Sequence, residues 1–508
     1  MGPRGARPSL PVRREGHGGP ARPGAPRIAS ARERAAALLA AQLRKFPDFE
    51  IAQLDTAGLD ARDAALAHAI YDLVLRRWIT LHHLIQPLMD MPMEETPHKA
   101  VAPLLCGAAQ ILFMDRIPAR AAVDEAVELA KLGAGVRAGG MVNAVLRRFI
   151  DEFGEGSSLE RRDKWNAARD ELPLADGRAL VLPRQVLSKD PMSLISVATS
   201  HPIELLRSWS RTMSMREVRR LAHHGVADPP TILNTMFATT GLPLRRPEAP
   251  TEAAGGVAAG DPKERGSKLR ATVVAAPQID YGYGLTPHKL PGHHVWSGPH
   301  DQLAAMLRSR RDVWVQDPAS SLGVASVADL KPGLVLDLCA GMGTKTRQLA
   351  ATFPNAKIIT TDVDLPRFKT LQQVFKGNEQ VTAVPYASLI DYAGKADLIL
   401  LDVPCSNTGV LARRVEARYR FDRTRLDKLA GIQKQIIADS IPLLNRSGKG
   451  QILYSTCSLD PAENEQQARW AAQWHQFKVT REHRRLPEGG PGEPDEQYTD
   501  GSYAVLLQ

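Results

Sequence analysis

The chain has 508 residues, with 65 Lys and Arg against 56 Asp and Glu, a formal charge of +9 and four cysteines. Its apolar fraction of 43% and charged fraction of 24% are ordinary for a globular protein, and they exclude collagen-like, disordered and disulfide-scaffold classes. The longest mostly apolar run, 101–114, contains Pro103, Gly107 and Gln110 and is too short to span a bilayer. We therefore expect no membrane helix and no membrane partner.

The cysteines, Cys106, Cys339, Cys405 and Cys457, form no CxxC pair. This spacing argues against a zinc knuckle and a disulfide framework, so we expect no metal site and reduced thiols in the cytoplasm. The basic N-terminus has no apolar segment behind it, which argues against a signal peptide. An isoelectric point near 9.4 fits a polyanionic partner such as nucleic acid, although many basic proteins bind none.

The chain divides into five stretches by composition. Residues 1–30 form a Gly/Pro/Arg tail with six arginines, which predicts a disordered basic tail. Residues 31–155 carry helical spacing of apolar residues, as in Leu66, Ile70 and Leu73, and predict an all-α domain. Residues 156–240 predict a small mixed α/β subdomain. Ten of the forty residues in 241–280 are Gly or Pro, so 241–300 is interpreted as a linker or insert.

Residues 301–508 show short apolar runs that alternate with helical stretches. The runs are 334–338, 358–361, 398–401 and 452–454. Buried strands that alternate with helices indicate a parallel sheet, so this part predicts a doubly wound, Rossmann-like α/β domain. In such a sheet the ligand crevice lies at the carboxyl ends of the strands.

The loop after the first of these strands contains Gly341 and Gly343, which allow a tight turn and a close backbone approach to a ligand. The spacing fits neither a phosphate-binding P-loop nor a full dinucleotide fingerprint. Asp362 ends the next strand, where a carboxylate can accept hydrogen bonds from ribose hydroxyls. This pattern favours a nucleoside without a pyrophosphate, for which S-adenosylmethionine is the commonest cosubstrate; a tight turn without a ligand is the alternative.

Two cysteines follow later strands. Cys405 stands in Asp402-Val403-Pro404-Cys405 and Cys457 in Ser455-Thr456-Cys457-Ser458. A thiolate is an effective nucleophile, and its addition to C6 of cytosine makes C5 electron-rich enough to attack a sulfonium methyl group. Paired thiols at equivalent strand ends therefore favour methylation of a pyrimidine over a packing role.

These loops resemble the Sun (Fmu) family of RNA cytosine-C5 methyltransferases, in its bacterial RsmB type that acts on small-subunit ribosomal RNA. The resemblance runs from about Gln316 to Ala504, and the segments 111–118 and 141–148 are similar to the NusB-like RNA-binding domain that precedes the catalytic domain there. It implies an enzyme that uses S-adenosylmethionine and acts on rRNA. Because the target base must leave its stack to reach both the thiol and the methyl donor, we expect a single-stranded or distorted region of RNA as substrate, and we expect the protein to be a monomer. The resemblance also implies that Cys457 is the nucleophile and that Cys405 assists release of the methylated RNA.

The same resemblance implies the cosubstrate site. The loop after the first strand would wrap the methionine part, Asp362 would hold the ribose, and Asp402 would lie beside cosubstrate and base. The residues implied in the loop are Cys339, Ala340, Gly341, Met342, Gly343, Thr344 and Lys345. Arginines 413, 414, 418 and 420, after the Pro-Cys loop, are candidate contacts to the RNA backbone.

Three departures from the family pattern keep other functions open. Met342 and Thr344 stand where the family has proline and glycine, Asn407 stands where it usually has glycine, and 384–388 lacks the acid that faces the adenine. The altered loop around Met342 and the missing acid favour, as an alternative, a noncatalytic RNA-binding or ribosome-assembly protein on a degenerate methyltransferase fold. A third interpretation, DNA cytosine methylation, predicts that Cys405 carries the covalent bond.

Overall fold

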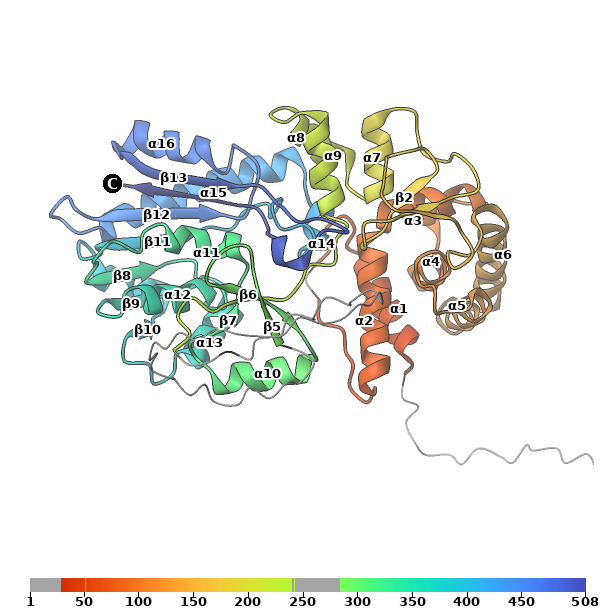
Figure 1. The fold of residues 1–508 in the computed structure, drawn as a ribbon, viewed down its shortest axis with the longest axis horizontal. Helices are drawn as coiled ribbons and strands as arrows, with labels where there is room; N and C mark the ends of the chain where they lie inside the picture. The colour runs from red at the N-terminus through yellow and green to blue at the C-terminus, as the bar shows by residue number, and fades with distance from the viewer. Residues whose placement is uncertain (1–28, 51, 240–241, 243–283) are drawn as a thin grey trace, which may run out of the picture.

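The structure is a computed structural model that describes residues 29–50, 52–239, 242 and 284–508. Its N-terminal part, residues 31–153, is built of helices (Figure 1, right). Ser30 begins the first helix by accepting a hydrogen bond from the Glu33 backbone N–H. Apart from its last two residues, the tail predicted over 1–30 lies outside the described residues. The helices are α1 (Ala31–Leu43), α2 (Ala61–Arg76), α3 (Trp78–Ile85), α4 (His98–Phe113), α5 (Ala119–Ala134) and α6 (Val136–Phe153).

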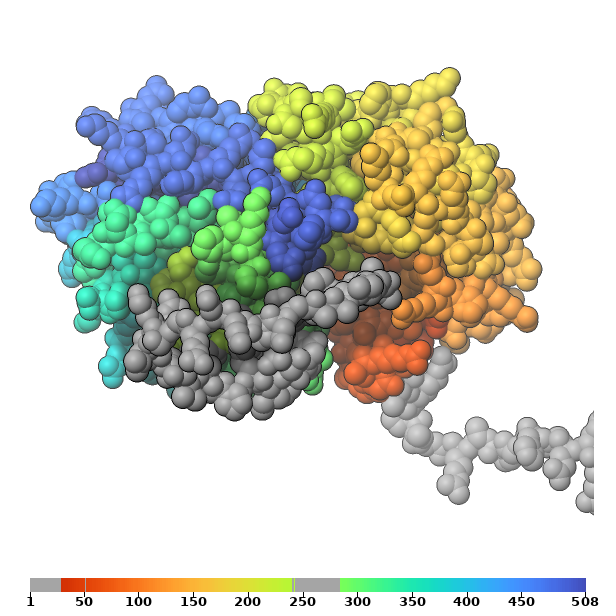
Figure 2. All heavy atoms as spheres, viewed as in Figure 1, coloured from red at the N-terminus to blue at the C-terminus, as the bar shows by residue number. Residues whose placement is uncertain are grey.

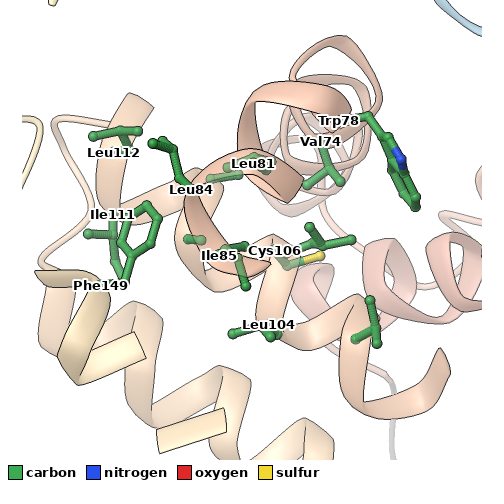
Figure 3. Close-up of a cluster of buried hydrophobic side chains, with 14 of the residues drawn as sticks. Val74, Trp78, Leu81, Leu84, Ile85, Leu104, Cys106, Ile111, Leu112 and Phe149 are labelled. Carbon is green, nitrogen blue, oxygen red and sulfur yellow. The ribbon is translucent and has the colours of Figure 1, made fainter. Parts of the chain in front are cut away.

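The centre of this helical bundle is α4, whose residues from Ala100 to Leu112 are all buried. Side chains from α2, α3, α4 and α6 meet around it (Figure 3). Leu81, Leu104 and Phe149 are fully buried in this core, and Cys106 lies among them as a small apolar side chain. The segment 141–148, similar in sequence to the NusB-like domain, lies within α6, which begins directly after Gly135 with its positive φ of 91°.

A connecting region joins the helical bundle to the α/β part. It contains a small antiparallel sheet in the order β1-β3-β2, followed by a helical group that packs between the two halves (Figure 1). In Figure 2 this yellow-green helical group sits between the orange helical bundle and the blue C-terminal part. The elements are β1 (Arg161–Arg162), β2 (Glu171–Pro173), β3 (Ala179–Val181), α7 (Pro191–Thr199), α8 (Ile203–Ser210) and α9 (Met215–His224).

The expectation of a linker or insert over 241–300 is corrected at its described end. Residues 284–297 form a hairpin of two strands whose second strand, β6, pairs with β4 from outside this interval, in a four-stranded sheet of order β5-β6-β4-β7. The alternation of buried and half-exposed residues in 293–297 was hidden in sequence by the high Gly/Pro content just before it. The elements are β4 (Ile232–Asn234), β5 (Gly284–Pro287), β6 (His293–Ser297), α10 (His300–Ser309) and β7 (Trp314–Val315).

The C-terminal part is built on a seven-stranded sheet of order β10-β9-β8-β11-β12-β14-β13. The first five of these strands are parallel, and β14 runs antiparallel to both of its neighbours, β12 and the edge strand β13. The sheet is therefore doubly wound with one reversed strand next to its edge. The strands are β8 (Leu334–Asp337), β9 (Lys357–Thr360), β10 (Val381–Ala383), β11 (Leu398–Asp402), β12 (Gln451–Thr456), β13 (Val479–Arg485) and β14 (Ser502–Leu507).

Helices cover both faces of this sheet. One face packs against α15 and α16 through Ile437, Ala468 and Ala471. The other packs against α11, α12 and α13 through Val324, Leu349 and Leu371. The strand order reverses between β8 and β11, and an open α/β sheet binds ligands at such a switch point. The helices are α11 (Pro318–Ala325), α12 (Thr344–Thr352), α13 (Leu365–Val374), α14 (Val415–Tyr419), α15 (Arg423–Ser440) and α16 (Glu465–His475).

No helix within the described ranges has the length and apolar character needed to cross a bilayer.

Candidate active site

The loop that follows β8 lies at the switch point of the sheet. Gly341 and Gly343 both have positive φ values, 57° and 84°, and Gly343 caps the N-terminus of α12. A Cβ on Gly343 would lie 2.7 Å from the Phe375 ring, whereas a Cβ on Gly341 would meet open space. Gly343 is therefore required for packing and for the turn, and Gly341 leaves room above the loop.

Asp362, just after β9, fixes the position of this loop. Its Oδ2 accepts a hydrogen bond from the Gly341 backbone N–H at 2.8 Å, and its Oδ1 accepts one from the Asp364 N–H at 2.8 Å. Each carboxylate oxygen has a second acceptor site, so the same group remains able to accept a ligand hydroxyl.

Lys345 connects the β8 loop to the end of β11. Its Nζ donates to Asp402 Oδ2 at 2.7 Å, and Asp402 Oδ1 accepts from the Ser455 hydroxyl at 2.9 Å. Burial lowers the pKa of Lys345, but the Asp402 carboxylate outweighs this effect and raises it. The lysine is therefore cationic, and it lines a cleft with Cys457, Ser455 and Gly501 that we call the cysteine cleft.

The two cysteines predicted from sequence lie side by side. Cys405 Sγ and Cys457 Sγ are 3.3 Å apart, at the carboxyl ends of the neighbouring strands β11 and β12. Neither forms a disulfide. The hydrogen bond with Cys457 and burial hold the pKa of Cys405 well above its ordinary value, so Cys405 stays protonated at neutral pH.

Two glycines, Gly409 and Gly501, allow the two cysteine loops to approach each other closely. A Cβ on Gly409 would lie 2.7 Å from the Cys457 carbonyl oxygen and 2.9 Å from that of Gly501. Gly409 also donates its N–H to the Cys457 carbonyl at 2.8 Å and accepts from the Gly501 N–H at 2.7 Å. The pair of thiols therefore depends on close backbone contact, as well as on the parallel register of β11 and β12.

Asn407 explains one departure from the family pattern. Its φ is 59°, in the left-handed region that glycine adopts easily and that asparagine tolerates best among the other residues. Its side-chain oxygen accepts from Cys457 Sγ at 3.1 Å, and its Nδ2 donates to the Cys405 carbonyl at 2.8 Å. The side chain thus contacts both cysteine residues.

Glu463 is a member of the site that sequence reasoning missed. This fully buried carboxylate accepts from the Ser406 N–H at 2.9 Å, from the Ser406 hydroxyl and from Gln433 Nε2 at 3.0 Å. Burial raises its pKa above the ordinary value. A buried carboxylate that gathers donors from the loop beside Cys405 positions that loop; the signal in sequence was an acid shortly after the Thr-Cys-Ser motif.

Cys339 differs from the other two site cysteines. It lies in the β8 loop, and burial together with the nearby Asp337 carboxylate raises the pKa of its thiol. Its thiol is therefore neutral, and the residue is partly exposed. Within the described residues, no three His, Cys, Asp or Glu side chains lie together in a group that could hold a metal ion.

The residues around the β8 loop fit a nucleoside. Asp337 Oδ1 is buried at the end of β8 without a hydrogen-bond partner among the described residues. Met342 is 60% exposed and Val363 78% exposed, and Tyr386 follows β10 at the same edge of the sheet. Exposed apolar side chains beside a polar turn provide surface for a purine ring. Asp391 lies on the surface further along the chain.

The prediction that Arg418 contacts RNA is wrong. Arg418 is fully buried and donates to the carbonyls of Thr199, Ser200, Gly225 and Leu411. Four carbonyl partners from separate segments make it a structural cation, which one sequence position cannot reveal.

Two of the other three arginines also have protein partners. Arg413 forms ion pairs with Asp500 at 2.7 Å and Asp317 at 3.2 Å, and Arg420 pairs with Glu416 at 3.3 Å. Arg414 is exposed. Of the four arginines in this stretch, Arg414 is the one that remains fully available at the surface.

Two protein-family models match this chain, one in its N-terminal part and one in its C-terminal part. Residues 327–499 match the sequence model of the 16S rRNA methyltransferase RsmB/F family, and residues 29–151 match that of the NusB family. The chain joins a NusB-family domain to an RsmB/F-family methyltransferase domain. The resemblance noted from the loop residues is thereby confirmed.

Two relatives align with most of the chain. Ribosomal RNA small subunit methyltransferase B of Vibrio cholerae is 27% identical over 87% of this chain and 88% of its own length. A probable ribosomal RNA small subunit methyltransferase B of Bacillus subtilis is 25% identical over 80% of this chain and 79% of its own length. The crystal structure of PH0851 shares the fold, with a TM-score of 0.64 at 18% identity over 94% of this chain and 98% of that chain.

Proposed function

We infer that the protein transfers a methyl group to C5 of a cytosine in small-subunit rRNA. The observation that carries this inference is the pair of thiols, Cys405 and Cys457, 3.3 Å apart beside the Lys345–Asp402 ion pair. The names of the aligned relatives support rRNA as the substrate. Because both thiols must stay reduced, we place the reaction in the cytoplasm.

S-adenosylmethionine, bound over the β8 loop, would supply an electrophilic methyl group on a sulfonium. We assign its methionine part to the loop from Cys339 to Lys345 and its ribose to Asp362. Open space above Gly341 and the free acceptor capacity of Asp362 support this assignment. Asp402, held by Lys345 and Ser455, would face both the cosubstrate and the base.

In the reaction we infer, Cys457 attacks C6 of the flipped cytosine as a thiolate. The C5–C6 electron pair moves to C5, which becomes the carbon that takes the methyl group. The C5 proton then passes to a base, the C5–C6 double bond forms again, and Cys457 leaves as a thiolate. Cys405, a protonated thiol 3.3 Å from the leaving sulfur, would assist this last step by hydrogen bonding to it.

Adduct trapping tests the roles of the two thiols. RNA that carries 5-fluorocytosine has no C5 proton to lose, so a covalent adduct accumulates. We expect Cys457→Ala to abolish the adduct and Cys405→Ala to retain it. Loss of the adduct only in Cys405→Ala would reverse the two roles, and bisulfite sequencing of rRNA from a deletion strain would locate the methylated cytosine.

One observation favours the alternative of an RNA-binding protein without transferase activity. The segment after β10, where the family places an acid, presents Pro385 and Tyr386 instead of a carboxylate. Calorimetric titration with S-adenosylmethionine separates the two functions. Heat of binding below millimolar ligand supports the transferase, and its absence at millimolar ligand supports the alternative.

A further inference from the structure

A second cavity opens beside Cys405, away from the cysteine cleft. It has a volume of about 400 Å³ and lies between the loop 405–407 and the segment 417–432 of α14 and α15. We call it the α15 pocket. Its size falls within the range of ordinary ligand sites, and the reaction inferred above leaves it without an occupant.

The α15 pocket combines an apolar wall with a basic rim. Phe421, Leu429 and Ile432 contribute the apolar wall, and Arg420 and Lys428 contribute positive charge. Lys428 is exposed and forms no ion pair with any residue that the structure describes. This combination of stacking surface and free cation is what single-stranded nucleic acid sites use.

The charged side chains that line the α15 pocket give it a net positive charge. Asp422 is its acidic side chain, and it is paired with Arg425, which also lines the pocket, at 2.9 Å. Arg425 contacts Asp48 of the helical domain as well. The rim therefore continues toward the NusB-family domain, so an RNA strand that leaves the α15 pocket would meet that domain next.

Each of the two thiols lines a different cavity. Cys457 lines the cysteine cleft and not the α15 pocket, whereas Cys405 lines the α15 pocket and not the cysteine cleft. Cys405 Sγ lies 3.3 Å from Cys457 Sγ, so an RNA strand attached to a cytosine on Cys457 would begin directly beside the α15 pocket. The next site along that strand is the α15 pocket.

We propose that the α15 pocket binds the nucleotide adjoining the methylated cytosine, with its base against Phe421 and Ile432 and its phosphate at Lys428. This proposal rests on the function inferred above. Holding the neighbouring nucleotide out of its stack favours the flipped state of the target base, and it makes the identity of that neighbour part of substrate selection.

Site-specific crosslinking tests the proposal in the full chain. The photoreactive residue p-benzoylphenylalanine is introduced at Ile432, which is 48% exposed, and the protein is irradiated with an unmethylated small-subunit rRNA transcript. The matched control carries the same residue at Val479, which is 43% exposed at the start of β13. Val479 pairs with Leu507, which also pairs with Ile452 at the amino end of β12, so it lies at the opposite edge of the sheet from the thiols.

We expect a crosslink from position 432 to a nucleotide directly beside the cytosine that bisulfite sequencing finds methylated, and none there from position 479. A crosslink to that cytosine itself, to a distant nucleotide, or to no nucleotide while methylation proceeds would each overturn the proposal. Absence of any methylated cytosine with the unmodified protein would instead refute the proposed function.

A kinetic variant gives a second, independent measurement. Ile432→Ala removes part of the apolar wall of the α15 pocket, and Lys428→Gln removes the free charge. We expect each to raise KM for the transcript about tenfold and to leave kcat within about twofold, since stacking and phosphate contacts bind the neighbour rather than the reacting base. Equal KM values for both variants and the unmodified protein would contradict the proposal.

Discussion

Asn407 serves both the backbone and a thiol in the cysteine cleft. It holds a φ of 59° and accepts from Cys457 Sγ at 3.1 Å. Asn407→Gly keeps the backbone conformation and removes the acceptor, whereas Asn407→Ala removes the acceptor and adds strain of about 1 kcal/mol. We expect both variants to slow adduct formation with 5-fluorocytosine RNA about tenfold, the equivalent of one hydrogen bond.

Urea unfolding separates the two effects of these variants. The alanine variant is expected to be less stable than the glycine variant by about 1 kcal/mol, although both lose the same hydrogen bond. Adduct formation at the unmodified rate in both variants would show that the amide does not orient the thiol.

Asp337 makes stability depend on pH. Burial raises its pKa to about 7, against the opposing hydrogen bond from Thr346, while the unperturbed group titrates near 3.8. Between these values the folded protein holds a proton that the unfolded chain has released, so this contribution to stability is complete below pH 4 and is lost as the pH rises through 7. Asp337→Asn keeps an acceptor for Thr346 and cannot ionise.

The test for Asp337 compares urea unfolding of the two proteins without ligand at pH 5 and pH 8. We expect the stability of the unmodified protein to fall relative to Asp337→Asn over this interval. Because both proteins share all other titrating groups, including the buried Asp317, the difference isolates one carboxyl group. Parallel pH profiles would show that Asp337 is ionised throughout.

At the scale of elements, the contact between the two cysteine loops depends on Gly409. Its Cβ position lies 2.7 Å from one backbone oxygen and 2.9 Å from another, and backbone cannot yield as a side chain can. We expect Gly409→Ala to cost about 2 kcal/mol of stability and to abolish the 5-fluorocytosine adduct. The control is Gly140→Ala on an exposed face of α6, where a Cβ meets open space and helix propensity predicts a gain of about 1 kcal/mol. Equal stability of the two variants would refute the argument.

The strands that sequence predicted correctly are those buried on both faces. Apolar runs identified β8, β9, β11 and β12, and with them the edge where the thiols meet. The outer strand β13 was missed because residues 479–485 include Arg481, Arg484 and Arg485 and alternate between exposed and half-exposed. A polar edge strand has the composition of a loop, and its pairing with β14 becomes visible only in three dimensions.

The site residues that could be predicted from sequence are those at the carboxyl ends of apolar strands. Cys405, Cys457 and Asp402 come directly after apolar runs, so the parallel register brings them together. Glu463 and Arg418 were not assignable, because most of their partners lie 30 to 219 positions away in the chain. A buried charge is defined by these distant partners rather than by its neighbours in sequence.

At the scale of the whole molecule, α14 joins the two family domains. It follows the Cys405 loop, lines the α15 pocket and packs against α2 of the NusB-family domain. Its last residue, Tyr419, lies in a cluster of aromatic rings with Phe49 and Trp78 of the helical domain. The Tyr419 hydroxyl donates to the Leu75 carbonyl and lies 3.0 Å from the Ser200 hydroxyl. One phenol thus links three parts of the chain.

Tyr419→Phe retains the ring and removes these hydrogen bonds, leaving the Leu75 carbonyl buried without its partner. We expect a loss of about 1 to 2 kcal/mol, concentrated at the interface, so that a single calorimetric transition separates into two as the domains uncouple. The control, Tyr392→Phe, removes a hydroxyl that bonds to no residue in the described part of the chain and should leave one transition at the same temperature. Because α14 also lines the α15 pocket, Tyr419→Phe should also raise KM for the rRNA transcript. A variant that melts in one unshifted transition with unchanged KM would show that the two domains are joined by surface area alone, and that the phenol contributes nothing to the alignment of the pocket.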